Sequence, residues 1–129
     1  MRLVALSALR VGESPRFGDV DRDLVLALAT EAAAVPPIVV HWPTMRVVDG
    51  IHRLLAARVR GDQAMRVKFF SGTLDDAFVL SVYYNGVSGF PLTEAERLAA
   101  VARIHRTHPH WPLWVIRALA GLPVLSFPA

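Results

Sequence analysis

Apolar residues recur along this chain with two different periods, which predict short strands and amphipathic helices. Short apolar runs bounded by turn residues predict strands, and apolar residues spaced three and four apart predict helices. The expected strands cover residues 2–9, 38–40, 46–48 and 65–70. The expected helices run from residue 19 or 21 to about 34, from 50 to 60, from 74 to about 84, from 94 to about 108 and from 112 to about 120. This order predicts an α+β fold in which a small mixed sheet with packed helices is followed by a C-terminal helical part.

Residues with special backbone or capping properties mark the ends of these helices. Pro36 and Pro37 stop the first helix, because proline removes a backbone N–H donor. Gly61 has the position of a helix C-terminal glycine. Thr93 and Glu96 have the spacing of a capping box, which predicts that a helix begins between them.

Helical spacing also predicts which side chains of these helices point into the core. Polar residues occupy the opposite faces, as in amphipathic helices of globular proteins. The expected inward residues are Leu54, Leu55 and Val59 in the helix from 50 to 60, Phe78, Val79 and Val82 in the next, and Leu98, Val101 and Ala102, with Ile104 nearby, in the helix from 94.

The composition supplies ample material for a core and excludes several kinds of chemistry. Of the 129 residues 53% are hydrophobic, yet no apolar run reaches the roughly 20 residues of a membrane span. Arg10 and Glu13 interrupt the N-terminal apolar stretch, which predicts a first strand and no signal peptide. The absence of cysteine excludes disulfides, thiolate metal sites and thiol catalysis, and is compatible with the expected cytoplasmic location. The formal net charge of +3 permits an anionic partner.

The strand-to-helix junction at Gly50 carries the main candidate binding residues. Gly50 allows a sharp turn and a close approach of a ligand to the backbone. The first N–H groups of the following helix lack intrahelical partners and carry partial positive charge, so they attract anions. Because His52 and Arg53 add donors at the same end, the simplest interpretation is a phosphate pocket, with Asp49 capping the helix or orienting one of them. The alternatives are an ordinary junction with exposed basic residues, and a metal or general-base site with His41, whose spacing matches no ligand motif.

The residues around Gly50 resemble a known sequence box. Asp49-Gly50-Ile51-His52-Arg53-Leu54-Leu55-Ala56-Ala57 resembles the Gly-x-(His/Arg)-Arg-x-x-Ala box of the ParB/sulfiredoxin superfamily. Within it, the closest resemblance is to StrR-type activators of antibiotic gene clusters, whose box also reads Asp-Gly-x-His-Arg. The resemblance covers about residues 3–122. Further segments that agree in order are Ser14-Pro15-Arg16, Pro36-Pro37-Ile38-Val39-Val40, Asn85 and Leu92-Thr93-Glu94.

The resemblance implies a cofactor, its ligands and its partners. In that superfamily the box binds the phosphates of a nucleotide, CTP in the partition proteins, with a divalent metal, and binding closes a clamp on DNA. The implied cofactor is therefore a nucleoside triphosphate, CTP, with Mg²⁺, bound by a ParB-like domain at residues 1–91. Asn85 is the implied metal ligand, and the implied partners are the nucleotide, DNA and a second copy of the chain. The residues implied to hold the nucleotide are Gly50, Ile51, His52, Arg53, Arg16 and Pro37.

Two departures from the family pattern bear on catalysis. The partition proteins have glutamate at the positions of Ile51 and Tyr84. Without these carboxylates the hard oxygen ligands that Mg²⁺ prefers are missing, so at most weak triphosphatase activity is expected. Sulfiredoxins carry their reactive cysteine at the position of Ile51, which excludes that activity.

Residues 92–129 resemble the start of a helix-turn-helix. The recognition helix that enters the major groove should follow Gly121-Leu122. Pro123 and Pro128 bracket the following residues, where no such helix can form, so we expect an incomplete motif. The candidate DNA contacts are Arg103, Arg106 and His108, and the alternative for this basic cluster is a solvated helix end.

Three interpretations of the function remain open at this point. The first is a nucleotide-binding regulatory module of a DNA-binding transcriptional regulator or partition-type protein. The second is a nucleotide hydrolase or phosphotransferase on the same fold, for which Glu13, Asp49, Asp75 and Asp76 are candidate carboxylates. The third is a domain that has lost ligand binding and dimerises through residues 94–122.

Overall fold

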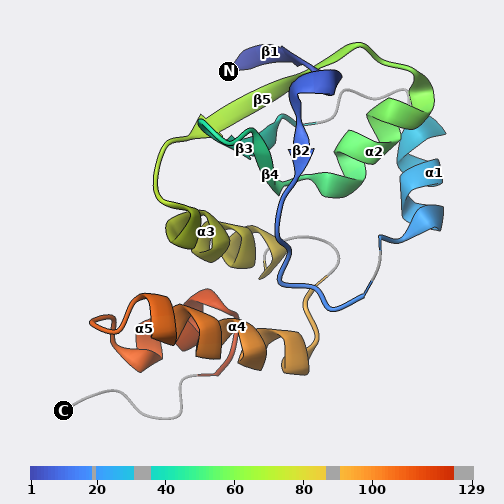
Figure 1. Cartoon of the computed structure of the whole chain (residues 1–129). Helices are drawn as coiled ribbons and strands as arrows, with labels where there is room; N and C mark the ends of the chain where they lie inside the picture. Colours follow the sequence, from blue (N-terminus) through green and yellow to red (C-terminus); the bar gives the residue numbers. More distant parts are fainter. Residues whose placement is uncertain (19, 31–35, 87–90, 124–129) are drawn as a thin grey trace. The chain divides into compact units, whose positions relative to one another are not determined.

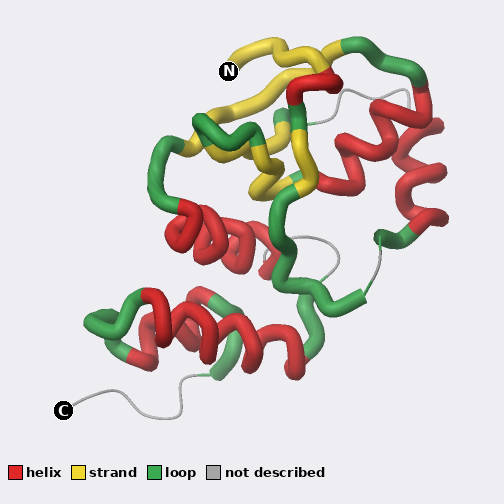
Figure 2. Tube along the Cα trace, viewed as in Figure 1, coloured by secondary structure: helices red, strands yellow, loops and turns green. Residues whose placement is uncertain are grey.

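The computed structural model describes residues 1–18, 20–30, 36–86 and 91–123. The chain forms two compact units. The first consists of Met1–Glu13 and Gly18–Gly72 and contains all the described strands. The second consists of Ser14–Phe17 and Thr73–Ala129, and its described secondary-structure elements are all helices (Figures 1 and 2). The two units divide after Gly72, whereas the sequence predicts a boundary between two functional domains after residue 91. That functional boundary stays a prediction.

The described part of the first unit is built on a five-stranded mixed sheet in the order β1-β5-β3-β4-β2. β1 pairs antiparallel with β5 and β3 antiparallel with β4, whereas β3 with β5 and β2 with β4 are parallel. The mixed sheet and its helices confirm the predicted α+β class. The strands are β1 (Arg2–Ala5), β2 (Arg10–Val11), β3 (Ile38–His41), β4 (Arg46–Asp49) and β5 (Ala64–Phe70).

The N-terminal segment forms two strands on opposite edges of the sheet, so the prediction of one strand over residues 2–9 is wrong. A 3-10 turn at Leu6–Ala8 separates β1 from β2, and Leu6 and Leu9 are both buried. In a flat sheet, four strand spacings of about 4.8 Å would place the edges about 19 Å apart, too far for so short a connection. The sheet therefore curls, and the three-residue spacing of the two leucines marks the turn (Figure 1).

Helices α1 (Arg22–Thr30) and α2 (Ile51–Arg60) pack against each other in the first unit (Figure 1). Leu54 and Ala57 of α2 are fully buried in a core with sheet residues such as Val40. Val59 is 57% exposed, so the prediction that it points inward is wrong. It lies five positions after Leu54, about 140° further round the helix.

Helices α3 (Leu74–Gly86), α4 (Glu94–Thr107) and α5 (Leu113–Leu119) form the second unit. Leu98 is 46% exposed and Ala102 is exposed, so these two predicted inward positions of α4 are wrong. No described helix is long and apolar enough to cross a membrane. The buried core of this unit contains Phe78, Val79, Val82, Leu92, Ala100, Val101, Ile104, Ile116, Ala120 and Leu122.

Candidate functional site

Gly50 joins β4 to α2 in a conformation that only glycine adopts without strain. Its φ of 106° and ψ of 28° lie in the left-handed region. A Cβ at this position would overlap Cγ2 of Ile38 and lie 2.9 Å from its Cβ. The predicted sharp turn is therefore confirmed, and the missing side chain also lets the backbone pass directly against β3.

The first turn of α2 presents backbone N–H groups that no described side chain caps. The first intrahelical bond is donated by the Leu54 N–H to the Gly50 carbonyl oxygen over 2.9 Å, so the N–H groups of residues 51–53 precede it. By contrast, α4 is closed by a capping box. Uncapped N–H groups at the positive end of a helix dipole attract anions.

His52 in this turn is oriented by the start of α1. The Asp21 N–H donates to Nε2 of His52 over 3.2 Å, which places the proton of a neutral ring on Nδ1. The Asp21 side chain accepts from the Leu24 N–H over 3.1 Å and so caps α1, as predicted, whereas the alternative cap Asp19 lies outside the described residues. Sequence reasoning missed the Asp21–His52 contact because 31 positions separate the two residues.

Arg53 is bonded within the protein, in a different arrangement from the expected phosphate contact. Its Nη1 donates to the carbonyl oxygens of Pro36 and Pro37 over 2.8 and 3.3 Å. Its Nη2 donates to Oδ2 of Asp49 over 3.0 Å. Arg53 thus ties the start of α2 to the residues before β3 and to the end of β4. Asp49 orients Arg53, as one interpretation of the sequence proposed, and the pair neutralises a carboxylate close to the α2 terminus.

Substitution of Arg53 by alanine is expected to lower the free energy of unfolding by about 1–2 kcal/mol, because a half-buried ion pair and two carbonyl contacts are lost. Urea unfolding followed by circular dichroism measures the change. Arg66→Ala is the matched control, since Arg66 is an exposed arginine of β5 for which the described residues provide no ion pair. Equal stabilities of the two variants would show that Arg53 does not tie these segments together.

Arg16 and Asn85 meet in the second unit. The Arg16 Nε donates to Oδ1 of Asn85 over 2.9 Å, and the Asn85 Nδ2 donates to the Ser81 carbonyl oxygen over 2.7 Å. The amide oxygen that would bind a metal therefore faces a guanidinium. Asn85 fits the implied role of a metal ligand only if Arg16 moves away from that oxygen, and its role stays a prediction.

Glu96 fastens the Ser14–Phe17 segment to α4. Its Oε1 accepts from the Thr93 N–H and its Oε2 from the Phe17 N–H, both over 2.8 Å, and its side chain is buried. The bond from the Thr93 backbone, with lesser contributions from the Phe17 N–H and the charge of Arg16, lowers the pKa of Glu96 against the opposing effect of burial. The predicted capping box is confirmed, whereas the bond to Phe17 gave no signal in the sequence.

Two curated proteins are similar to nearly the whole of this chain. Transcriptional regulator NovG of Streptomyces niveus is 46% identical over 116 residues, which are 90% of this chain and 36% of that protein. The streptomycin biosynthesis operon possible regulatory protein of Streptomyces griseus is 38% identical over 120 residues, 93% of this chain and 34% of that protein. The chain thus spans about a third of the length of these relatives. No protein-family model matches it.

A solved structure shares the fold. A Pnob8-like ParB-N domain matches 82% of this chain and 44% of its own length with a TM-score of 0.61, at 19% sequence identity. This chain has the ParB-N fold. The predicted resemblance to ParB-type domains is confirmed in the fold. The predicted resemblance to antibiotic-cluster regulators is confirmed by the two Streptomyces relatives, of which one is named a transcriptional regulator and the other a possible regulatory protein.

The three candidate DNA-binding residues of this ParB-N-like chain differ from one another in what their side chains contact. The Arg103 guanidinium lies 3.8 Å from the centre of the Phe78 ring. Nε2 of His108 pairs with Oδ1 of Asp76 over 2.6 Å, which lowers the pKa of Asp76 and joins the end of α4 to the start of α3. Arg106 is exposed to solvent. DNA binding by these residues stays a prediction.

Both ring nitrogens of His41, in β3 of the ParB-N-like sheet, form hydrogen bonds within the protein. Its side chain is buried, with Nε2 bonded to the Gly72 carbonyl oxygen and Nδ1 to Oγ1 of Thr44, both over 2.7 Å. These bonds join the turn after β3 to the segment after β5. Among the described residues, no three His, Cys, Asp or Glu side chains are placed to share a metal ion.

Proposed function

We propose that this chain is the nucleotide-binding regulatory module of a transcriptional regulator, and that it binds the phosphates of a pyrimidine nucleoside triphosphate, CTP, at the start of α2. The observation that carries the proposal is the first turn of α2, which no described side chain caps and which Gly50 brings against β3. The regulatory part rests on the similarity to two Streptomyces proteins, one named a transcriptional regulator and the other a possible regulatory protein.

In this proposal the backbone N–H groups of residues 51–53 donate to phosphate oxygens, and His52 adds a side-chain donor from the same turn. Gly50 is required because any side chain would push the turn away from β3. Arg53 is a positioning residue, since it fixes the direction of the first turn through Asp49 and the carbonyl groups of Pro36 and Pro37.

The proposal includes Mg²⁺, which would be bound mainly by the triphosphate, as is usual for this cation. Asn85 is the protein ligand that the family resemblance implies, and its amide oxygen must exchange Arg16 for the metal. If nucleotide binding by an Asn85→Ala variant still depends on Mg²⁺ as in the wild type, Asn85 is not a metal ligand. That result would leave the proposal of phosphate binding at α2 in place.

Titration of the purified chain with labelled CTP, UTP, ATP and GTP, with and without Mg²⁺, tests the proposal. Saturable CTP binding is expected. Its affinity should fall about tenfold or more in His52→Ala, which loses one charge-assisted contact to phosphate, and in Arg53→Ala, which loses the contacts that position the first turn. His105→Ala, which changes an exposed histidine of α4, is the control and should bind as the wild type does. The proposal fails if no nucleotide saturates the wild-type chain or if Arg53→Ala binds equally well.

A further inference from the structure

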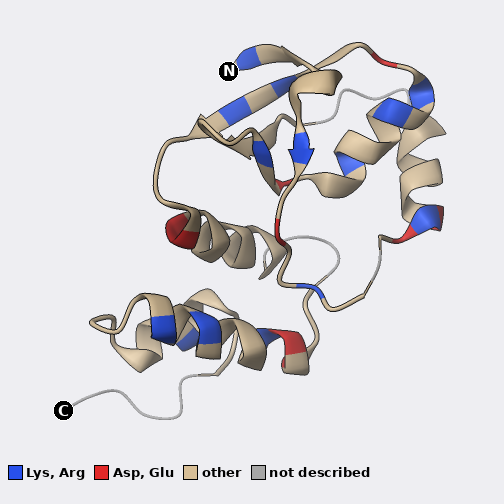
Figure 3. Ribbon diagram, in the orientation of Figure 1, with Lys and Arg blue, Asp and Glu red and all other residues tan. Residues whose placement is uncertain are grey.

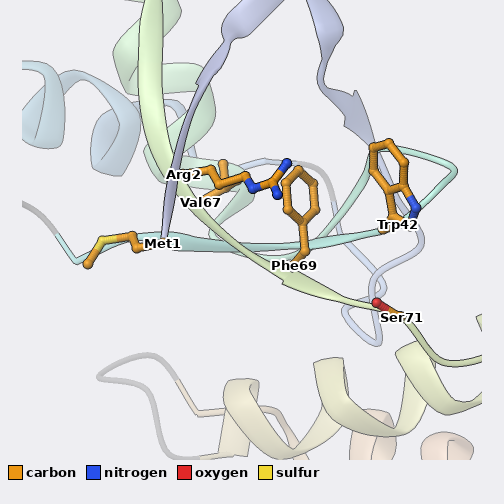
Figure 4. Close-up of a pocket in the computed structure, with 6 residues that line it drawn as sticks. All are labelled: Met1, Arg2, Trp42, Val67, Phe69 and Ser71. Carbon is orange, nitrogen blue, oxygen red and sulfur yellow. The ribbon is translucent and has the colours of Figure 1, made fainter.

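A notch at one end of the first unit's sheet is lined by residues that the proposed nucleotide site does not use. Its volume is about 470 Å³, within the range of about 300–1,000 Å³ typical of small-molecule pockets. None of its lining residues belongs to the box around Gly50. The lining residues are Met1, Arg2, Trp42, Val67, Phe69 and Ser71 (Figure 4).

The pairing of the strands creates this notch. β1 pairs with β5 from Ala5–Ala64 to Arg2–Val67, and Phe69 lies two positions further along β5. On the other side, the Trp42 N–H donates to the Phe70 carbonyl oxygen over 2.8 Å and holds the turn after β3 beside β5. Val67 and Phe69 share one face of β5, because side chains two positions apart point the same way. The notch thus has β1 on one side and Trp42 on the other.

Two aromatic rings make the notch suitable for a flat apolar group. The rings of Trp42 and Phe69 meet edge to face, with centroids 5.5 Å apart and planes at 73°. Trp42 is 52% exposed, which is high for the largest apolar side chain. Aromatic side chains that keep exposed ring surface stack with other aromatic rings.

Positive charge gives the notch a preference for an acid. Among its lining residues Arg2 has the one charged side chain, and Figure 4 shows the guanidinium directed toward the Phe69 ring. Within the described ranges Arg2 forms no ion pair. β5 also carries Arg66 and Lys68, which alternate with Val67 and Phe69 and so point to the other face of the sheet. Lys and Arg residues are seen along this strand in Figure 3. A carboxylate in the notch would pair with Arg2 through charge-assisted hydrogen bonds.

We infer that this notch binds a small planar aromatic compound with an acidic group, whose ring lies against Phe69 and Trp42 and whose acid pairs with Arg2. The inference is independent of the proposed nucleotide function, because the two sites share no residue. The inferred aromatic acid is chemically unlike the nucleoside triphosphate proposed for the start of α2.

The test uses three probe compounds: 2-naphthoate, its neutral amide 2-naphthamide, and cyclohexanecarboxylate, which keeps the acid and lacks the aromatic ring. Binding to the purified chain is followed by the ¹H–¹⁵N signals of its tryptophan indoles, with the Trp42 signal identified by its loss in Trp42→Phe. 2-Naphthoate should shift the Trp42 signal saturably and bind about tenfold more tightly than either other probe. Added CTP should not displace it.

Arg2→Gln and Arg66→Gln are the matched variants, since Arg66 is also an arginine of the sheet but does not line the notch. In Arg2→Gln the naphthoate should bind no better than the amide, whereas Arg66→Gln should keep the preference of the wild type. The inference is overturned if 2-naphthoate does not saturate, if the Trp42 signal stays unchanged, or if Arg2→Gln keeps the acid preference.

Discussion

Substitution of Gly50 by alanine is expected to lower the free energy of unfolding by about 3 kcal/mol and to remove nucleotide binding. About 1–2 kcal/mol of this comes from holding an L-residue in the left-handed region, and a similar amount from the overlap of the new Cβ with Ile38. Ile38 is fully buried, so its side chain has no room to turn away. The strain therefore has to move either the turn or β3.

Gly18→Ala is the control for this substitution, because a Cβ on Gly18 would meet no atom within 4 Å. Urea unfolding of both variants gives the comparison, and the control should stay within about 0.5 kcal/mol of the wild type. If Gly50→Ala were as stable as Gly18→Ala, the close approach of the turn to β3 described here would be wrong.

Substitution of Glu96 by alanine is expected to lower the free energy of unfolding by about 2–3 kcal/mol, the sum of a lost helix cap and a lost hydrogen bond to a charged acceptor. The Thr93 and Phe17 N–H groups lose the acceptors that they have in the wild type. Glu94→Ala is the control, because Glu94 is exposed in the same first turn and interacts mainly with the helix dipole. Equal effects of the two substitutions in urea unfolding would contradict this role of Glu96.

The lowered pKa of Glu96 gives the same residue a pH signature. Its ionised form contributes stability that is fully present above the pKa of an unfolded glutamate and is lost as the pH falls through the lower, folded-state value. Between about pH 6 and about pH 3, Glu96→Gln should therefore lose less stability than the wild type. Asp76, whose pKa is lowered by His108, should act in the same direction and remain in both proteins. A Glu96→Gln variant that loses stability in parallel with the wild type would contradict the assignment.

The local features of this fold were predictable because single residues or short spacings specify them. Gly50, Gly61 and the Thr93 capping box mark their turns and caps directly, and the structure has them as predicted. The curl of the sheet was not predictable in this way, because it depends on β1 and β2 pairing with strands on opposite edges. Leu98 reads as a core residue by spacing, yet the α4 stripe through Val101 and Ile104 is the one that is buried.

The candidate site shows the same limit. The types of residue at the α2 terminus and their order are read directly from the sequence, and the family resemblance implies their roles. The sequence did not show that Arg53 is engaged by Asp49 and by the carbonyl groups of Pro36 and Pro37, because those contacts form only when β3 and α2 are packed. The notch between Arg2 and Trp42 was not predictable for the same reason, since it forms where β1 and the turn after β3 both lie beside β5.

The central claim is that the first turn of α2 holds phosphate, and the backbone amide signals of Ile51, His52 and Arg53 test it most directly. In a ¹H–¹⁵N titration with CTP and Mg²⁺, these amides should move downfield together, saturably, and with the dissociation constant that labelled CTP gives. The amide signals at the capped start of α4 should stay in place and serve as the internal reference. A titration that leaves the three α2 amides unmoved at saturating CTP would contradict the account.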